Sequence, residues 1–408
     1  MHSSKISYMN IKATEYISVF LLLICPILAF PIIIYLIYKG SNKAYYFLAI
    51  FLGIIAYLSP PIWDLYRHNM LYYQMQNWNV QYLLLVFSTS GLVAPLTSYI
   101  LGCNDISFQW QRFIFTIIEC SCIFWLLLQQ HYKCTGRTRL IFLLLVLIGF
   151  NFYWAIESVR GPLAMCLYLV GSYNILHNRY FLFSTILLLI SCFTHTFYLV
   201  FTIITFIILL TNLNLGQRTN IICSLIALLL GSTITLFFNQ ILLDLIGIGA
   251  SEKYTTGAWA QEQINQQGFN SLVYYQLKRF WFIPIYIYYF LNFTRDKWST
   301  LIGIIGMMYL CTLSFWTISE RVADLLCMLL IYNYIYTFKN THYKLINLVL
   351  ISMCMYATIV MIRRRFILLP QNNFYSELIY PLPIILSNEQ YDLDWINKNL
   401  IDDDFKNK

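Results

Sequence analysis

Long apolar segments recur through almost the whole chain, and they restrict its fold more than any other feature of the sequence. A helix that crosses a membrane needs about 20 mostly apolar residues, and segments near that length follow one another from residue 16 to residue 362. Charged residues make up 11% of the 408 residues, against about 25% in an ordinary soluble domain. The sequence therefore predicts an all-α polytopic integral membrane protein with about 11 to 13 transmembrane or re-entrant helices.

The apolar segments themselves bound the expected spans. We place these spans at 16–38, 44–59, 113–130, 140–156, 160–176, 180–194, 196–211, 219–243, 272–293, 298–316, 320–338 and 344–362. Segment 80–101 is apolar but is interrupted by Ser-Thr-Ser-Gly and Pro95. We expect it to dip into the membrane or to lie at the interface, where protein covers its irregular backbone.

The domain organisation follows from these spans. We expect one transmembrane catalytic domain over 1–362, with outer loops at 60–112 and 244–271, and a polar C-terminal tail over 363–408. The Gly- and Gln-rich loop 244–271 fits either a lid over a saccharide or a solvated connector. The last part of the tail, 387–408, is polar and is expected to be disordered or to lie on the surface.

Basic residues set the expected orientation. The net charge is +8, but Lys and Arg are dispersed over short loops, without the basic stripe that nucleic-acid binding requires. The positive-inside rule places six short basic loops in the cytoplasm. These loops contain Lys39, Arg139, Arg179, Arg218, Arg295 and Lys339. The remaining loops then lie on the outer, periplasmic-like face of the membrane.

Two charged residues lie together inside the apolar segment NFYWAIESVRGPLAM. A charge at membrane depth usually faces a cavity or a partner, because its transfer into lipid is costly. Glu157 and Arg160 are three residues apart and pair on one helix face if the helix is continuous, which fits a structural ion pair or a functional site. The Arg160 guanidinium matches phosphate oxygens, and it also suits a contact with lipid headgroups.

A histidine lies at the centre of the apolar stretch 181–211, which is too long for one comfortable helix across a bilayer. We expect a break at Thr194-His195-Thr196 that places the imidazole at the tip of two helices. There the imidazole fits a proton acceptor or a donor to phosphate. A buried histidine that only hydrogen-bonds its neighbours is the alternative.

The loop SPPIWDLYRHNMLYYQMQNWN, residues 59–79, combines aromatic rings with polar groups. Rings that stack on sugar faces beside a carboxylate are typical of saccharide binding, so Trp63, Asp64, Tyr66 and Arg67 are candidates. The same composition is typical of an aromatic belt at a membrane interface.

Further cations precede two later helices on the expected outer side. Arg321 lies in TISERVADLL beside Glu320 and Asp324, and Arg279 lies in YYQLKRFWF beside Lys278. Together with Arg160 they suit a lipid-linked diphosphate. The eleven cysteines show no metal-ligand spacing, so we expect neither a metal nor another cofactor.

These residues resemble a known family. An Arg160-x-x-x-Ala164 start of one helix, His195 between two apolar runs, an Asp64-x-Tyr66 loop and Arg321 near the start of a late helix are similar to the EpsG-like, Wzy-type polysaccharide polymerases. The resemblance covers roughly residues 16–362. Pro60 to Trp63 stand where the family pattern often has Arg and Gly before Asp-x-Tyr.

The resemblance implies a glycosyltransferase of the bacterial inner membrane. Its active site faces the periplasm, where it polymerises undecaprenyl-diphosphate-linked oligosaccharide repeats into O-antigen or a similar surface polysaccharide. It implies that Arg160 and Arg321 bind the diphosphate and that His195 activates the acceptor hydroxyl or helps to bind the leaving group. Asp64 and Glu157 are the alternative bases, and Arg279 is a diphosphate candidate from its expected position alone. The expected partners are the lipid-linked substrate, the bilayer and, as a candidate, a chain-length regulator protein.

Three other classes remain open. A flippase or transporter of lipid-linked oligosaccharide needs a cation-lined path through the membrane, and internal repeats would favour it. A polyprenyl-phosphate-sugar glycosyltransferase is favoured by an acidic pair in the first outer loop, where 59–79 has one Asp. A membrane acyltransferase needs an acidic or Asn partner near the histidine.

Overall fold

The computed structural model describes most of the chain. It covers residues 2–62, 64–75, 91–130, 134–233, 282–312, 316–338, 348–353, 355, 374–388, 391–401 and 404–405. These residues are almost entirely helical, and two short strands near the C-terminus pair in an antiparallel hairpin. The all-α class predicted from the sequence therefore holds for the described part of the chain.

The elements follow one another in this order: α1 (His2–Ile24), α2 (Pro26–Lys39), α3 (Lys43–Leu58), α4 (Asp64–Met75), α6 (Val93–Cys103), α7 (Phe108–Gln130), α8 (Gly136–Phe150), α9 (Phe152–Glu157), α10 (Gly161–Leu176), α11 (Phe181–Thr194), α12 (Tyr198–Thr211), α13 (Gln217–Thr233), α18 (Ile283–Leu291), α19 (Lys297–Cys311), α20 (Trp316–Thr337), α22 (Phe374–Glu377), α23 (Leu382–Ser387), α24 (Leu393–Asn399), β1 (Leu400–Ile401) and β2 (Asp404–Phe405).

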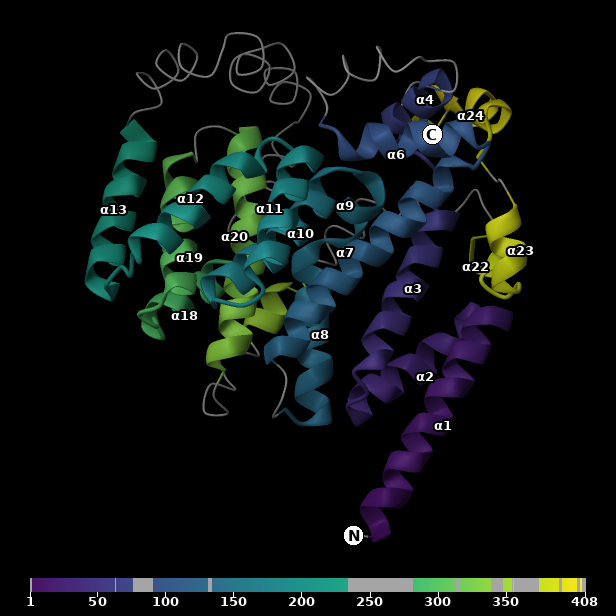
Figure 1. Ribbon diagram of the computed structural model, residues 1–408, viewed down its shortest axis with the longest axis horizontal. Coiled ribbons are helices and arrows are strands. Elements are labelled where there is room, and N and C mark those ends of the chain that lie inside the picture. Colours follow the sequence, from purple (N-terminus) through teal and green to yellow (C-terminus); the bar gives the residue numbers. More distant parts are fainter. Residues whose placement is uncertain are drawn as a thin grey trace.

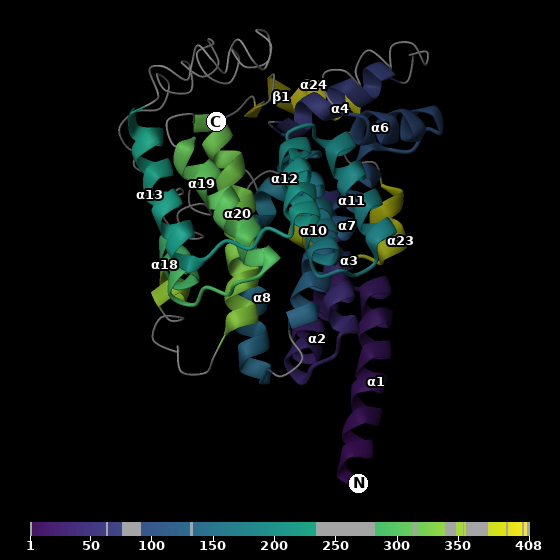
Figure 2. The same ribbon diagram turned by 60° about the vertical axis from the view of Figure 1, so that its left-hand side comes forward.

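Most of the longer helices run side by side, and three short ones lie across one end of them. Figure 1 shows α3, α7, α8, α10, α13 and α20 running up and down, with α4, α6 and α24 at the upper end and the N-terminal part of α1 projecting below. Figure 2 shows the same grouping after rotation. We call the end that carries α4, α6 and α24 the crossed end.

The apolar pattern predicted several helices well. The expected spans 44–59, 160–176, 180–194 and 196–211 correspond to α3, α10, α11 and α12 within two residues. The expected 219–243, 272–293 and 344–362 lie partly outside the described residues, as does the first part of 80–101. The last part of 80–101 forms α6, which lies across the crossed end (Figure 1).

Two predicted spans are wrong as single helices. Segment 16–38 is divided between α1 and α2 at Cys25, because Pro26 has no N–H to continue the hydrogen-bond ladder and instead begins α2. Segment 140–156 is divided between α8 and α9 at Asn151, which adopts a left-handed φ of 51°. Asn tolerates that conformation better than most residues.

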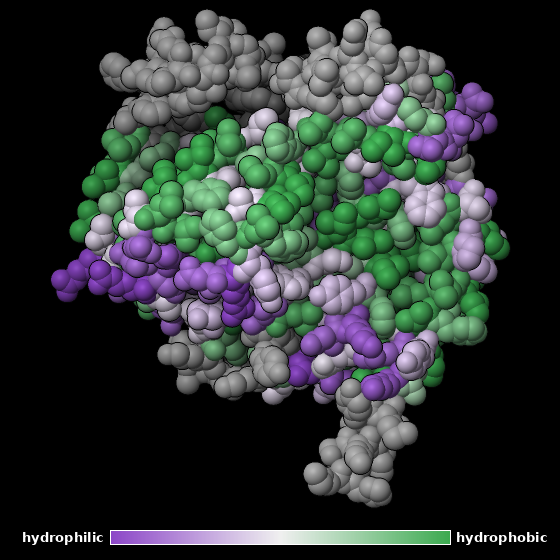
Figure 3. Space-filling view, in the orientation of Figure 1, coloured by the Kyte–Doolittle hydropathy of each residue, from purple (hydrophilic) through white to green (hydrophobic). Residues whose placement is uncertain are grey.

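The helices pack around a continuous apolar core and leave an apolar outer surface. Exposed side chains on α11 and α12 include Leu182, Phe183, Leu189, Phe193, Leu199, Ile203, Ile207 and Leu210. Figure 3 shows apolar side chains over much of the visible face and hydrophilic ones gathered in a band below. A broad apolar surface of this kind marks an interaction site, and a lipid bilayer is one such partner.

Helix length limits which elements cross a bilayer alone. In the described part of the chain, one helix, Phe108–Gln129, is long and apolar enough by length and composition, and the other apolar helices have 10–17 residues. A helix of 14 residues such as α11 is about 21 Å long, whereas a bilayer core is about 30 Å thick.

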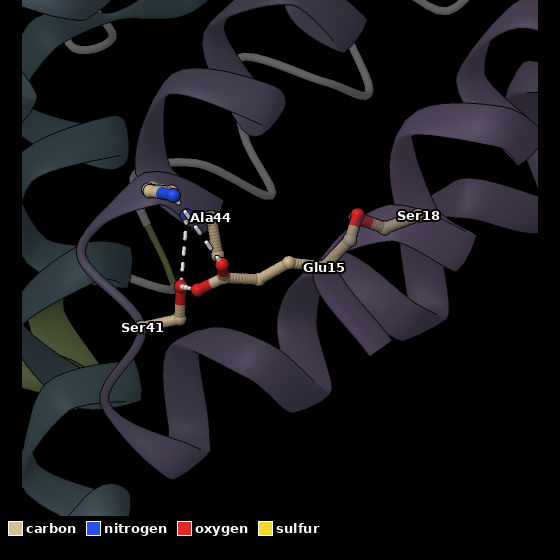
Figure 4. A network of polar contacts seen from close by, with 5 residues as sticks. Glu15, Ser18, Ser41 and Ala44 are labelled. Atoms are coloured by element: carbon tan, nitrogen blue, oxygen red, sulfur yellow. Dashed lines mark hydrogen bonds and ion pairs between the residues drawn. The ribbon is translucent and has the colours of Figure 1, made fainter. Parts of the chain in front are cut away.

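A polar contact joins α1 to the corner between α2 and α3 (Figure 4). The Ser41 hydroxyl donates to a carboxylate oxygen of Glu15 over 2.6 Å, and the N–H of Ala44 donates to the Ser41 oxygen over 3.4 Å. Lys43 lies 3.7 Å from the other Glu15 oxygen. The negative charge of the largely buried Glu15 carboxylate is therefore compensated by the Ser41 hydroxyl and the Lys43 ammonium group.

The C-terminal end of α3 is capped by side chains from other elements. The last carbonyl groups of a helix have no partner within it. The Gln109 side chain donates to the backbone carbonyl oxygen of Tyr57 over 3.1 Å, and the Arg112 side chain donates to the backbone carbonyl oxygen of Ser59 over 2.6 Å. Both donors come from the start of α7, and the Arg112 charge also complements the negative end of the α3 dipole.

Candidate functional site

Four of the candidate residues predicted from the sequence lie towards the crossed end because helix direction places them there. Arg160 immediately precedes α10, and Arg321 lies in the first turns of α20. His195 follows the last residue of α11, and Asp64 is the first residue of α4. The neighbouring helices run in alternating directions, so starts and ends that are distant in sequence meet at one end.

The predicted break at His195 is present. α11 ends at Thr194 and α12 begins at Tyr198, and His195 has an extended backbone with φ −151°. Its backbone N–H donates to the backbone carbonyl oxygen of Ser191 over 2.9 Å, and its own carbonyl accepts from the backbone N–H of Tyr198 over 3.0 Å. These bonds close both helix ends and fix the backbone that carries the imidazole.

One backbone contact defines the protonation of the imidazole. The backbone N–H of Phe197 donates to Nδ1 of His195 over 3.3 Å. A backbone N–H is always the donor, so Nδ1 is unprotonated and the neutral ring carries its proton on Nε2. In this arrangement His195 offers an N–H donor from Nε2.

Two guanidiniums flank this histidine. Burial, and then the charges of Arg321 and Arg160, lower the pKa of His195 from 6.5 to about 3. The Arg321 guanidinium carbon also lies 5.9 Å from the centre of the Phe197 ring. The charges of Arg160 and Arg321 therefore both act on His195, and at pH 7 its imidazole is neutral.

The backbone before Arg160 is irregular, which differs from one expectation. α9 ends at Glu157, and α10 begins only at Gly161 with Pro162 in its first turn. Glu157 and Arg160 therefore do not share the continuous helix that an i, i+3 pair requires. A Cβ at position 161 would lie 2.7 Å from the Trp154 ring, so glycine permits this close turn.

Helix α4 adds a carboxylate and a second histidine. Nε2 of His68 lies 3.8 Å from Oδ2 of Asp64, one helical turn earlier. Burial lowers the pKa of His68 from 6.5 to about 4; the Asp64 charge opposes this shift, and Arg160 and Arg67 add to it. The charge of Arg160 thus acts on both histidines.

One neighbour of Arg321, Tyr198, was not among the candidate residues from the sequence. Tyr198, at the start of α12, is 4% exposed and interacts electrostatically with Asp324 and Arg321. Its ring packs edge-on against His195, with the ring centres 6.3 Å apart. The sequence signal was the position of Tyr198 three residues after His195, at the same expected helix break.

The start and middle of α7 hold two further charged residues that were not among the candidate residues from the sequence. Arg112 and Glu119 are 3% and 1% exposed. Within the described residues, Nε and Nη2 of Arg112 and Oε2 of Glu119 make no hydrogen bond. A charge within the apolar run 108–130 is the signal that would have identified both.

The remaining candidates are placed differently. Tyr66 packs beside Ile62, Ile396 and Leu400, and Arg67 is exposed on α4. Trp63, Lys278, Arg279 and the loop 244–271 lie outside the described residues. Among the residues that the structure does describe, no three His, Cys, Asp or Glu side chains gather as metal ligands would.

Apolar helices with a broad apolar outer surface are typical of a helical membrane protein. The chain belongs to the EpsG family, whose model matches residues 96–376, more than half of the chain. This confirms the resemblance that the sequence motifs indicate. Membership supports a polymerase-like role in polysaccharide biosynthesis at a membrane. Neither the curated proteins nor the solved structures contain a match.

Proposed function

We propose that this protein polymerises undecaprenyl-diphosphate-linked oligosaccharide repeats into O-antigen or a similar surface polysaccharide. The reaction takes place at the periplasmic face of the bacterial inner membrane, with the crossed end on that side. The observation that carries the proposal is that Arg160 and Arg321 lie near enough to the buried His195 imidazole for both charges to lower its pKa, at one end of an apolar helical assembly. Membership of the EpsG family supports the same reaction class.

The proposed reaction is a glycosyl transfer between two lipid-linked substrates. A hydroxyl of the acceptor repeat attacks the anomeric carbon of the donor chain, and the bond between that carbon and the diphosphate oxygen breaks. The diphosphate leaves with the bonding electrons, and the acceptor proton passes to a base. Negative charge grows on the leaving oxygen, where the guanidiniums of Arg160 and Arg321 stabilise it. The proposed transfer needs no metal, and Arg279 is a third candidate cation.

His195 has two candidate roles, and its surroundings favour one of them. A general base works best when its pKa lies near the working pH, whereas burial and two cations hold the pKa of His195 at about 3. Its Nε2 N–H remains available as a donor, so we assign it to the leaving diphosphate. The base is then a carboxylate, for which Asp64 and Glu157 are the candidates. Trp63, Tyr66 and Arg67 are proposed saccharide contacts.

Deletion and complementation test this proposal against the other classes. We expect a deletion strain to make a lipid core that carries one repeat and no polysaccharide ladder on a gel. Loss of even the single repeat would point to a flippase or to a polyprenyl-phosphate-sugar transferase. A chain-length regulator partner would show as a changed ladder distribution when that partner is removed.

Point variants test the diphosphate role. Arg160→Ala should fail to restore the ladder at wild-type protein level, and Arg160→Lys should restore little, because Lys lacks the planar fork that matches phosphate. Arg179→Ala is the matched control: Arg179 lies at the opposite end of α10 and donates to Gln129 over 3.2 Å. A normal ladder with Arg160→Ala would refute the role.

A further inference from the structure

The C-terminal segment, residues 391–401, is held against α4. We call it the clasp. Ile396 and Leu400 of the clasp are 1% and 5% exposed and form an apolar cluster with Ile62, which lies two residues before the start of α4. Tyr66, Met70 and Tyr73 of α4, together with Trp395 of the clasp, pack around this cluster.

Hydrogen bonds fix the clasp to the same region. The Tyr391 hydroxyl donates to the Leu58 oxygen over 2.7 Å, which caps one more carbonyl at the end of α3. The Tyr73 hydroxyl donates to the backbone carbonyl oxygen of Tyr391 over 3.3 Å. The clasp therefore contacts α4 and also the end of α3 from which the chain enters α4.

Helix α4 is enclosed from two sides. Its inner face packs Leu65 and Tyr72 into a cluster with α6, α7 and α10, and the Tyr72 hydroxyl donates to the Ile106 oxygen over 2.7 Å. Its outer face, with Tyr66, Met70 and Tyr73, meets the clasp. A helix of 12 residues is marginal by itself in water, so the clasp supplies packing that α4 needs.

The clasp and α4 also share a position relative to the family match. The EpsG model matches residues 96–376, and both α4 and the clasp lie outside this range, before and after it. Two segments from opposite ends of the chain therefore meet beside a site whose cations, Arg160 and Arg321, come from the matched part.

We propose that the clasp is a positioning element of the site: it holds α4 so that Asp64 and His68 face Arg160. This inference rests on the proposed function, because it assigns Asp64 a place in that reaction. The geometry behind it is the shared cluster of Ile62, Ile396 and Leu400 together with the 3.8 Å contact between Asp64 and His68.

A pair of isoleucine variants provides the test in the full-length protein reconstituted in liposomes. Ile396→Ala removes packing from the contact between α4 and the clasp, whereas Ile385→Ala removes the same side chain from α23, where Ile385 is 2% exposed in the main core. We expect Ile396→Ala to lower the turnover by at least about tenfold, with the affinity for undecaprenyl diphosphate within about twofold of wild type. Ile385→Ala should keep its turnover, and Ile396→Val should restore most of it.

Equal turnover of the two alanine variants would overturn the inference. A parallel loss of diphosphate affinity in Ile396→Ala would also overturn it, because it would indicate general loss of structure. A spin label at Gln74→Cys, on the exposed side of α4, should become more mobile in Ile396→Ala and not in Ile385→Ala. Unchanged label mobility would refute the positioning role by itself. If the wild-type protein makes no polymer, the proposed function fails, and the label still tests the clasp.

Discussion

Leu92 donates its backbone N–H to the carbonyl oxygen of Phe193 over 2.6 Å. This bond ties the segment before α6 to the last turn of α11, directly before His195. Gly91 makes the approach possible because its φ is +78° and it has no side chain. A Cβ there would lie 2.7 Å from the backbone carbonyl oxygen of Thr194 and 2.9 Å from that of Phe193. The crossed end is thus fixed to the helix break by backbone contacts.

Gly91→Ala should disturb the candidate site. The new methyl group meets backbone oxygens, and the left-handed conformation adds about 1 kcal/mol or more of strain. We expect a fall in polymerase turnover of at least about tenfold, because small displacements of reacting groups are costly. Gly216→Ala is the control, since a Cβ there would meet one side-chain atom at 3.8 Å. Equal turnover of the two variants would contradict this prediction.

Two amide substitutions separate the candidate roles of His195. Gln places an N–H near the position of Nε2, and Asn places an acceptor near Nδ1. If His195 donates to the diphosphate, His195→Gln should keep more activity than His195→Asn, by about tenfold for one lost charge-assisted hydrogen bond. Equal loss of all measurable turnover in both variants would instead favour a base.

The pH dependence of stability follows from two lowered pKa values. His68 and His195 have pKa values of about 4 and about 3 in the folded protein, against about 6.5 when unfolded. Below pH 6.5 the unfolded chain binds protons that the folded protein does not, so acid favours unfolding. Stability should therefore fall as the pH drops from 6.5 towards 4, approaching about 1.4 kcal/mol per pH unit for each histidine.

Thermal unfolding in detergent between pH 7 and pH 4.5 measures this effect. The double variant His68→Gln with His195→Gln should show a shallower fall in melting temperature than the wild type. A slope equal to that of the wild type would mean that neither histidine stays neutral in the folded protein.

Two native cysteines report the orientation of the chain. Cys103 is exposed at the end of α6, on the crossed end, and Cys134 precedes α8 at the opposite end of the helices. In single-cysteine variants, a maleimide that does not cross membranes should label Cys103 in spheroplasts, and Cys134 only after permeabilisation. Burial raises the pKa of Cys134, so the labelling is done at alkaline pH. The reverse pattern would place the site in the cytoplasm.

The sequence determined the class of this protein and several of its helices. The apolar pattern and the helix-breaking effect of Pro or Gly depend on only a few neighbouring residues. For this reason the local sequence predicts α3, α10, α11, α12 and the break at His195. An arginine or histidine within an apolar run is costly wherever it lies, so Arg160 and His195 stood out as candidates before any contact was known.

The tertiary structure decided how these residues meet. The flanking of His195 by Arg160 and Arg321 depends on the directions and packing of α10, α11 and α20, which no single segment encodes. The burial of the clasp against α4 depends on Ile396 and Leu400, which are few among polar neighbours and gain their effect only by meeting Ile62. The clasp contact joins positions more than three hundred residues apart, and its free energy comes from apolar surface that is buried only when the chain has folded.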